Sequence, residues 1–131
     1  MAVADCNGLP VAIGIASGQR HEAPLVLETL RSRFVKPLPE RLIGDRAYDS
    51  DPLDAELADM GVDMIAPNKC HRRKMTQDLR KLRRYRRRWR VERLFSWLLN
   101  FRRLVTRYEY RADNYLAFCK LGCIAVLLRR I

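Results

Sequence analysis

The chain has 131 residues, of which 48% are hydrophobic, a length and composition that suit one compact domain. Its 26 lysines and arginines against 15 acids give a net charge of +11, which indicates a polyanion or a membrane surface as partner. The longest apolar run, residues 115–128, contains Lys120 and is shorter than the ~20 residues that cross a bilayer, and residues 1–5 do not resemble a secretory signal, so we expect an intracellular protein without a membrane span.

Two short β-prone runs open the chain, at residues 2–4 and 9–17. The Asn7-Gly8 dipeptide between them is typical of a two-residue hairpin turn with positive φ at both positions. We therefore expect an antiparallel pair of strands at the start of the fold.

A helix is expected over residues 22–34, because Leu27, Leu30 and Phe34 recur at helical spacing and share one face. Two prolines shortly after Phe34 end this helix, since proline cannot continue the pattern of backbone hydrogen bonds.

The next strand is expected over residues 41–44, and Asp45 stands at its carboxyl end. Asp51, followed by a proline, is typical of a helix start, and we expect that helix to end near Met60. A further strand is expected over residues 62–66.

The character of the chain changes after residue 67. Residues 68–76 are expected to form a basic loop, residues 78–99 a long arginine-rich helix, and residues 113–130 a final apolar helix capped by Asp113. Of the 26 basic residues, 16 lie at positions 69–107, together with only two acids, so this segment makes the protein basic.

The order of these elements predicts an α/β fold, and the opening hairpin makes the expected sheet mixed rather than purely parallel. We treat residues 1–131 as one domain, with an α/β sheet part at residues 1–67 and a basic helical part at residues 68–131.

The four cysteines, Cys6, Cys70, Cys119 and Cys123, contain no CxxC pair. Disulfides are uncommon in intracellular proteins, and the spacing does not favour a zinc site. We expect the cysteines to be buried as small hydrophobic side chains.

Asp45 and Glu92 are the acids whose positions suggest metal chemistry. Mg²⁺ and Mn²⁺ prefer oxygen ligands, and two such ions stabilise both the attacking and the leaving oxygen in phosphoryl transfer. Asp45 follows a predicted strand, where an open α/β sheet has its ligand crevice. An aspartate in that position is also a common turn or cap residue.

Glu92 is surrounded by arginines, and Arg88 and Tyr85 precede it by four and seven residues, so the three side chains share one helical face. Two interpretations remain open from the spacing alone. Arg88 and Glu92 form a weak surface ion pair, or Glu92 is a metal ligand beside arginines that bind phosphate.

Two segments carry a resemblance to a known family. Residues 44–49 (GDRAYD) resemble the second catalytic aspartate motif of insertion-sequence transposases of the IS5 and IS4-like group, and residues 88–95 (RWRVERLF) resemble their glutamate motif. The other segments similar to this family are residues 8–10 (GLP), 17–22 (SGQRHE), 101–104 (FRRL) and 107–109 (RYE). The resemblance covers nearly the whole chain in the family's order, a combination that chance rarely produces.

The resemblance implies a DDE transposase with an RNase H-like α/β fold, a mixed sheet flanked by helices. In this family two aspartates and a glutamate bind two Mg²⁺ or Mn²⁺ ions. These ions activate water to nick the end of the element and then activate the resulting 3′-hydroxyl to attack target DNA. Carried over by position, Asp45 and Glu92 are catalytic metal ligands, and Tyr85 and Arg88 complete a tyrosine–arginine–glutamate signature. The implied partners are element ends and target DNA, in a homo-oligomer or with an upstream-frame product, at the nucleoid in a bacterial cytoplasm.

Two departures from the family pattern matter. Leu99 replaces the signature's lysine, so that phosphate contact passes to Arg102 or Arg103 or is absent. The family's first aspartate lies on a strand upstream of the hairpin, so we expect a truncated sheet that lacks its first strand. Asp5 is the only early candidate for this aspartate, and it lies beside the hairpin turn. We expect the chain by itself to bind DNA and to cleave it poorly.

Contacts to DNA phosphates are expected from the basic segment, because neutralised phosphates dominate nonspecific affinity. The residues expected to make them are Tyr85, Arg88, Arg72, Arg73, Lys74, Arg86, Arg87, Arg102 and Arg103. Leu94, Phe95 and Leu98 recur at helical spacing and are expected to face the core, so we assign no base-stacking role to the aromatic side chains of this helix.

Three hypotheses follow. The leading one is a transposase fragment, from a frameshifted second reading frame or a decayed gene copy. The second is a basic nucleic-acid-binding module without catalysis, in which Asp45 and Glu92 lie far apart. The third is a stand-alone RNase H-like endonuclease, which needs Asp5 or another acid to complete its site.

Overall fold

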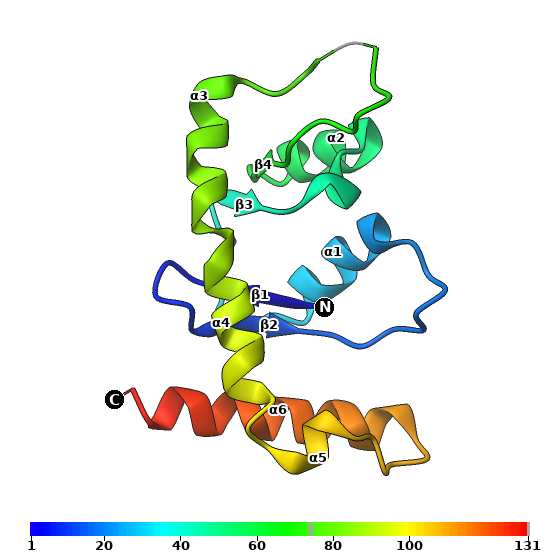
Figure 1. Ribbon diagram of the computed structural model, residues 1–131, viewed down its shortest axis with the longest axis vertical. Helices are drawn as coiled ribbons and strands as arrows, with labels where there is room; N and C mark the ends of the chain where they lie inside the picture. Colours follow the sequence, from blue (N-terminus) through cyan, green and yellow to red (C-terminus); the bar gives the residue numbers. More distant parts are fainter. Residues whose placement is uncertain (74, 131) are drawn as a thin grey trace.

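The computed structural model describes residues 1–73 and 75–130. Two pairs of strands and their helices lie along a helical rod that runs from Leu79 to Leu98 (Figure 1). The last helix, α6, crosses the end of this rod (Figure 1). Lys74, one of the expected DNA contacts, lies outside the described residues.

The chain begins with an antiparallel hairpin, as predicted, formed by β1 (Ala2–Ala4) and β2 (Pro10–Ile13). The expected two-residue turn is wrong. Asp5 closes a longer turn, because its Oδ1 accepts hydrogen bonds from the backbone N–H groups of Asn7 (2.7 Å) and Leu9 (2.8 Å). Within this turn only Gly8 has positive φ, at 79°. An aspartate that bonds its own following backbone favours such a turn.

The second pair of strands is parallel. β3 (Arg41–Ile43) lies beside β4 (Asp63–Ile65), and Leu42 is opposite Met64. Parallel strands need a crossover, which is made here by the short 3₁₀ helix η1 (Arg46–Tyr48) and the helix α2 (Asp51–Asp59). The predicted strand–helix–strand order is confirmed, and both strands are shorter than expected.

The expected single mixed sheet is not formed by the described residues. β1 pairs with β2 and β3 pairs with β4, which gives two separate two-stranded sheets. No strand within residues 1–73 or 75–130 joins the two pairs, so each pair keeps open edges. The α/β class is confirmed.

The first helix, α1 (Glu22–Arg31), ends three residues earlier than expected. Arg33 favours the early end, because its guanidinium donates a hydrogen bond to the Leu30 carbonyl (3.1 Å), an acceptor that a helix end leaves free, and another to the Lys36 carbonyl beyond the helix (2.6 Å). Leu30 is buried. The prediction for Phe34 is wrong, since it lies beyond the helix and is exposed.

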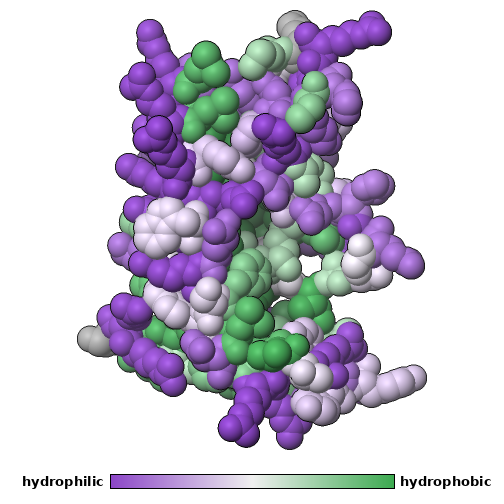
Figure 2. Space-filling view, in the orientation of Figure 1, coloured by the Kyte–Doolittle hydropathy of each residue, from purple (hydrophilic) through white to green (hydrophobic). Residues whose placement is uncertain are grey.

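The predicted long basic helix is a rod with three segments: α3 (Leu79–Leu82), the 3₁₀ segment η2 (Arg83–Arg88) and α4 (Trp89–Leu98). Asp78 begins it by accepting a hydrogen bond from the N–H of Arg80 (2.8 Å). The middle segment has the sequence RRYRRR and no buried side chain. Like charges three and four residues apart destabilise an α-helix, and no side chain of this segment is buried to offset that repulsion. Mostly hydrophilic side chains cover this part of the molecule (Figure 2).

The core has two clusters. One contains Val26, Leu30, Leu53, Leu57, Val62, Met64 and Ala66, and it joins α1, α2 and β4. The other contains Ile13, Leu94, Leu98, Leu104, Cys119, Cys123 and Val126, and it joins the hairpin to α4, α5 (Arg102–Val105) and α6 (Ala112–Leu128). The second cluster therefore holds α4 in a defined position against the hairpin.

Several burial predictions need correction. Leu94 and Leu98 are buried as expected, but Phe95 is 41% exposed, because residues one position apart on a helix point about 100° apart. Cys119 and Cys123 are buried, whereas Cys6 and Cys70 are exposed because they lie in loops. No helix of the described chain is long and apolar enough to cross a membrane.

Candidate active site

Asp45 is held at the carboxyl end of β3 by its own side chain. Its Oδ1 accepts a hydrogen bond from the N–H of Ala47 (2.9 Å) and so begins η1. Gly44 lets the chain turn tightly here, since a Cβ at this position would lie 2.6 Å from both Met64 Cε and Tyr48 Cδ2. The cap fixes one carboxylate oxygen of Asp45 and leaves Oδ2 available to other partners.

Tyr85, Arg88 and Glu92 lie on one face of the rod, as the spacing predicts. The guanidinium of Arg88 donates from Nη1 to the Tyr85 hydroxyl (3.1 Å) and from Nη2 to Glu92 Oε1 (2.9 Å). The same guanidinium lies over the Tyr85 ring, 5.6 Å from its centre. These contacts orient Arg88 at the junction of η2 and α4.

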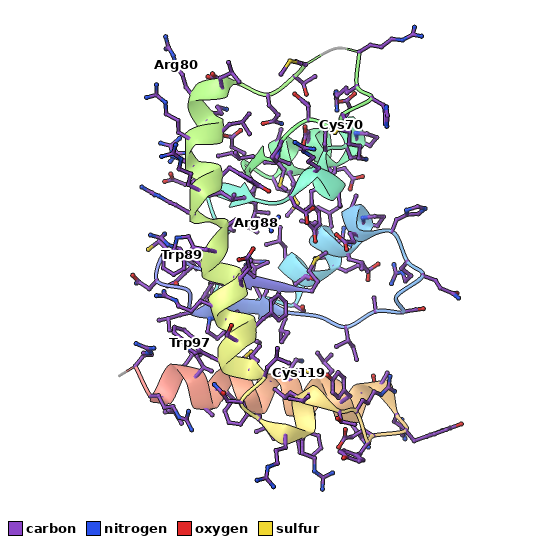
Figure 3. All side chains as sticks on the ribbon, viewed as in Figure 1. Cys70, Arg80, Arg88, Trp89, Trp97 and Cys119 are labelled. Atoms are coloured by element: carbon purple, nitrogen blue, oxygen red, sulfur yellow. The ribbon has the colours of Figure 1, made fainter. Side chains whose placement is uncertain are left out.

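Arg88 also brings the two candidate carboxylates together. Its Nη1 lies 3.7 Å from Asp45 Oδ2 while its Nη2 contacts Glu92, so one guanidinium bridges two acids that are 47 positions apart in sequence. The geometry arises because β3 packs against η2. Arg88 lies midway along the rod (Figure 3).

The site is open to solvent. The side chains of Arg88, Asp45 and Glu92 are 36%, 44% and 58% exposed. The hydrogen bond to Glu92 is the largest cause that raises the pKa of Arg88 above its usual value, with smaller contributions from Tyr85 and Asp45. The group therefore consists of one permanent cation and two carboxylates that a solvated ligand can reach.

Asp5 does not join Asp45 and Glu92. Its Oδ1 is occupied by two hydrogen bonds within its own turn, and no group of three or more His, Cys, Asp or Glu side chains in the described ranges is arranged to hold a metal ion. The Asp45–Glu92 pair nevertheless suits a hard divalent cation in donor type, since both groups offer carboxylate oxygens. The Arg88 guanidinium already occupies a place between them where a positive charge is stabilised.

Asp49 has a structural position that the sequence analysis missed. Its side chain is fully buried and accepts hydrogen bonds from the Asn68 amide (3.2 Å), the Lys69 N–H (2.7 Å) and Arg72 Nη1 (2.6 Å). Arg72 also forms an ion pair with Asp51. Arg72, expected to bind DNA, thus ties the basic loop to the start of α2. The sequence did offer a signal for this role, because Asp49 is the last residue of the GDRAYD motif.

The other expected DNA contacts lie in different places. Those in η2 and the loop, Arg73, Arg86 and Arg87, are exposed, as are Arg102 and Arg103 in α5. Arg103 pairs with Glu109 (3.2 Å). Among these expected contacts, Arg86 and Arg87 are the exposed arginines closest in sequence to Arg88 and Glu92.

A different face of α4 carries stacked arginine and tryptophan side chains. The Arg93 guanidinium lies 4.7 Å from the ring centre of Trp89 and 4.9 Å from that of Trp97, and it donates a hydrogen bond to the carbonyl of Asn7. Both tryptophans project from α4 in Figure 3. These contacts fasten the hairpin turn to α4.

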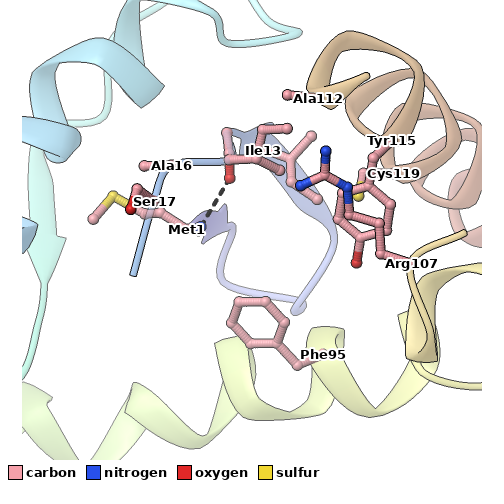
Figure 4. Close-up of a pocket in the computed structure, with 11 residues that line it drawn as sticks. Met1, Ile13, Ala16, Ser17, Phe95, Arg107, Ala112, Tyr115 and Cys119 are labelled. Carbon is pink, nitrogen blue, oxygen red and sulfur yellow. Dashed lines mark hydrogen bonds between the residues drawn. The ribbon is translucent and has the colours of Figure 1, made fainter. Parts of the chain in front are cut away.

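A pocket of about 550 Å³ lies elsewhere, between the hairpin, α4 and α6 (Figure 4). Its lining includes Ile13, Phe95, Arg107 and Tyr115, and it contains none of Asp45, Tyr85, Arg88 and Glu92. The amino group of Met1 donates a hydrogen bond to the Gly14 carbonyl there (2.8 Å), and burial lowers the pKa of that amine. The pocket is therefore separate from the Asp45–Glu92 pair.

Comparison with known proteins bears on this arrangement. Residues 1–128 match a family described as "Transposase DDE domain". The chain is also 34% identical over 132 residues to a Burkholderia cepacia protein described as "Putative transposase for insertion sequence element IS402". That match covers 95% of this chain and 59% of the relative, so the chain spans about three-fifths of the relative's length. No solved structure matches the chain.

Proposed function

Since the chain belongs to the transposase DDE domain family, we propose that it supplies part of the catalytic site of a metal-dependent insertion-sequence transposase, which cuts and joins DNA strands. The observation that carries the proposal is the bridging of Asp45 and Glu92 by one guanidinium. Two acids distant in sequence and converging on a cation are the arrangement that a shared metal ion requires.

Each residue of the site has a role in this proposal. Asp45 and Glu92 hold Mg²⁺ or Mn²⁺, which when bound would supply Lewis-acid activation of the attacking oxygen and stabilise charge on the phosphate. The hydrogen bond from Ala47 fixes the Asp45 carboxylate, and Tyr85 orients Arg88. The exposed arginines of η2 bind the DNA backbone beside the carboxylates.

We further propose that a third carboxylate comes from outside these 131 residues, on a strand that pairs with an open edge of β1. Three observations support this: Asp5 is committed to its turn, the described residues contain no third acid at the site, and the strand pairs have open edges. The chain alone then binds DNA and cleaves it poorly. A second copy or an upstream-frame product is the expected partner.

One observation favours a second candidate, a basic nucleic-acid-binding module without catalysis. Arg88 and Glu92 form an i,i+4 ion pair that would exist on such a helix for structural reasons alone. In that module Asp45 serves only as the cap of η1, but the wide separation of Asp45 and Glu92 expected for it is not observed, because Arg88 contacts both. A stand-alone endonuclease is less well supported, because it needs Asp5 at the site.

Mn²⁺ binding to the full chain, measured by electron paramagnetic resonance, distinguishes these functions. The transposase proposal predicts that Asp45→Asn and Glu92→Gln each weaken Mn²⁺ binding about tenfold or more, given that even indirect supporting groups of metal sites are worth 10- to 100-fold. Asp59→Asn removes an exposed acid of α2 and is the matched control. Equal Mn²⁺ affinity in all three variants would leave the binding module as the better account.

Nicking of supercoiled plasmid DNA in Mn²⁺ tests the origin of the third carboxylate. The isolated chain is expected to bind the plasmid and to produce little nicked product. Strong nicking that Asp5→Ala abolishes, while Asp59→Asn preserves it, would place the third carboxylate at Asp5 and refute its external origin.

A further inference from the structure

We propose that Arg88 couples metal binding to DNA binding: its guanidinium is the counter-ion of Asp45 and Glu92 in the metal-free chain, and it moves to a DNA phosphate when a divalent cation takes its place. This inference rests on the proposed function, because it requires the carboxylate pair to be a metal site. The inference adds that Arg88 exchanges the two carboxylates for a DNA phosphate when the metal ion binds.

The contacts of Arg88 show why it competes with a metal ion. Its Nη1 faces Asp45 Oδ2 and its Nη2 contacts Glu92 Oε1, so the guanidinium uses an oxygen of each carboxylate. These are the oxygens that a hard cation needs. Two positive groups cannot share them closely without repulsion, so an arriving ion weakens both contacts of Arg88.

A displaced Arg88 has no alternative acid nearby on its own segment. Glu92 is the only acidic residue between Asp78 and Glu109. The six other basic residues of α3 and η2, all on the amino-terminal side of Arg88, are Arg80, Lys81, Arg83, Arg84, Arg86 and Arg87. An external anion is therefore the favourable partner, and a DNA phosphate suits the forked donor geometry of arginine.

The exchange does not require unfolding. Arg88 is about one-third exposed and Glu92 more than half, while the buried residues of α4, Leu94 and Leu98, belong to a core cluster that Arg88 does not enter. The Tyr85 hydroxyl can keep one hydrogen bond to the guanidinium as it turns outward. A side-chain rotation is thus sufficient.

The coupling must act in both directions, because linked binding equilibria are reciprocal. DNA should tighten Mn²⁺ binding, since a phosphate draws Arg88 away from the carboxylates. Mn²⁺ should tighten DNA binding by the same factor. We expect that factor to be about fivefold or more, at the low end of typical coupling between sites.

The test measures Mn²⁺ affinity of the full chain by electron paramagnetic resonance, with and without a saturating 30-base-pair duplex. Arg88→Gln should bind Mn²⁺ about threefold or more tightly than wild type without DNA, because the competing cation is gone, and its coupling factor should fall well below the typical fivefold. The Mn²⁺ affinity and coupling factor of Arg88→Lys should lie between those of wild type and Arg88→Gln, because one ammonium group cannot bridge both carboxylates. Circular dichroism checks that each variant folds.

Arg84→Gln is the matched control, because it removes the same charge from an exposed position in η2. It should keep the wild-type coupling factor. If Arg88→Gln binds Mn²⁺ no more tightly than Arg84→Gln, or keeps the wild-type factor, the exchange is refuted while the metal site stands. If Asp45→Asn and Glu92→Gln leave Mn²⁺ binding unchanged, the proposed function fails together with the exchange.

Discussion

The buried carboxylate of Asp49 offers a quantitative test of how the basic loop is anchored. Asp49→Ala removes the acceptor of the Lys69 N–H (2.7 Å) and of the Asn68 amide (3.2 Å), both of which are partly buried. A donor left without an acceptor costs about 1–3 kcal/mol when buried. For two partly buried donors we expect a loss of about 2–4 kcal/mol in the free energy of unfolding.

Urea unfolding followed by circular dichroism measures this loss. With a slope of about 1.5 kcal/mol per molar urea, the midpoint should fall by roughly 1.3–2.7 M. Asp51→Ala is the matched control, because Asp51 contacts the same arginine but its side chain is 72% exposed, and its midpoint should shift much less. Equal shifts in the two variants would refute the reasoning that burial makes Asp49 the anchor.

Three further outcomes are expected. Gly44→Ala should lower the free energy of unfolding by about 1–3 kcal/mol through overpacking, whereas Gly18→Ala, where an added Cβ meets nothing within 4 Å, should not; similar urea midpoints would contradict this. Burial raises the pKa of Cys123 to about 11, so iodoacetamide at pH 8 should label the exposed Cys70 and spare Cys123, as read by mass spectrometry. Burial and nearby acids raise the pKa of Asp54, so its ionisation destabilises the fold as pH rises. Asp54→Asn should therefore raise the melting temperature at pH 7 but not near pH 4, where an ordinary aspartate titrates. A lower melting temperature of the variant at pH 7 would contradict this.

Much of the candidate site was predictable because it depends on local geometry. Tyr85, Arg88 and Glu92 share a face through spacings of three, four and seven residues, which any helical turn brings together. Asp45 follows a short apolar run, and its side chain caps the next turn as aspartates commonly do. The GDRAYD and RWRVERLF motifs indicated the family, which the comparison confirms.

Local patterns predicted the contacts of a side chain less well where more than one partner or environment was open to it. Arg72 belongs to a basic run typical of a DNA-binding loop, yet it pairs with two aspartates more than 20 positions earlier. Phe95 has an apolar side chain next to Leu94, but only one of the two can point at the core cluster. Charge and hydropathy describe what a side chain favours, and not which partner is within reach.

The sequence by itself determined the family, the α/β class and the residues of the Arg88 face, because motifs and helical periodicity are properties of neighbouring positions. Only the tertiary structure decided that Arg88 bridges Glu92 to Asp45, and that the two strand pairs remain separate within the described chain. Both results depend on how η2 packs against β3 and on which strand edges meet, and such contacts between distant segments arise from the shape of the folded core.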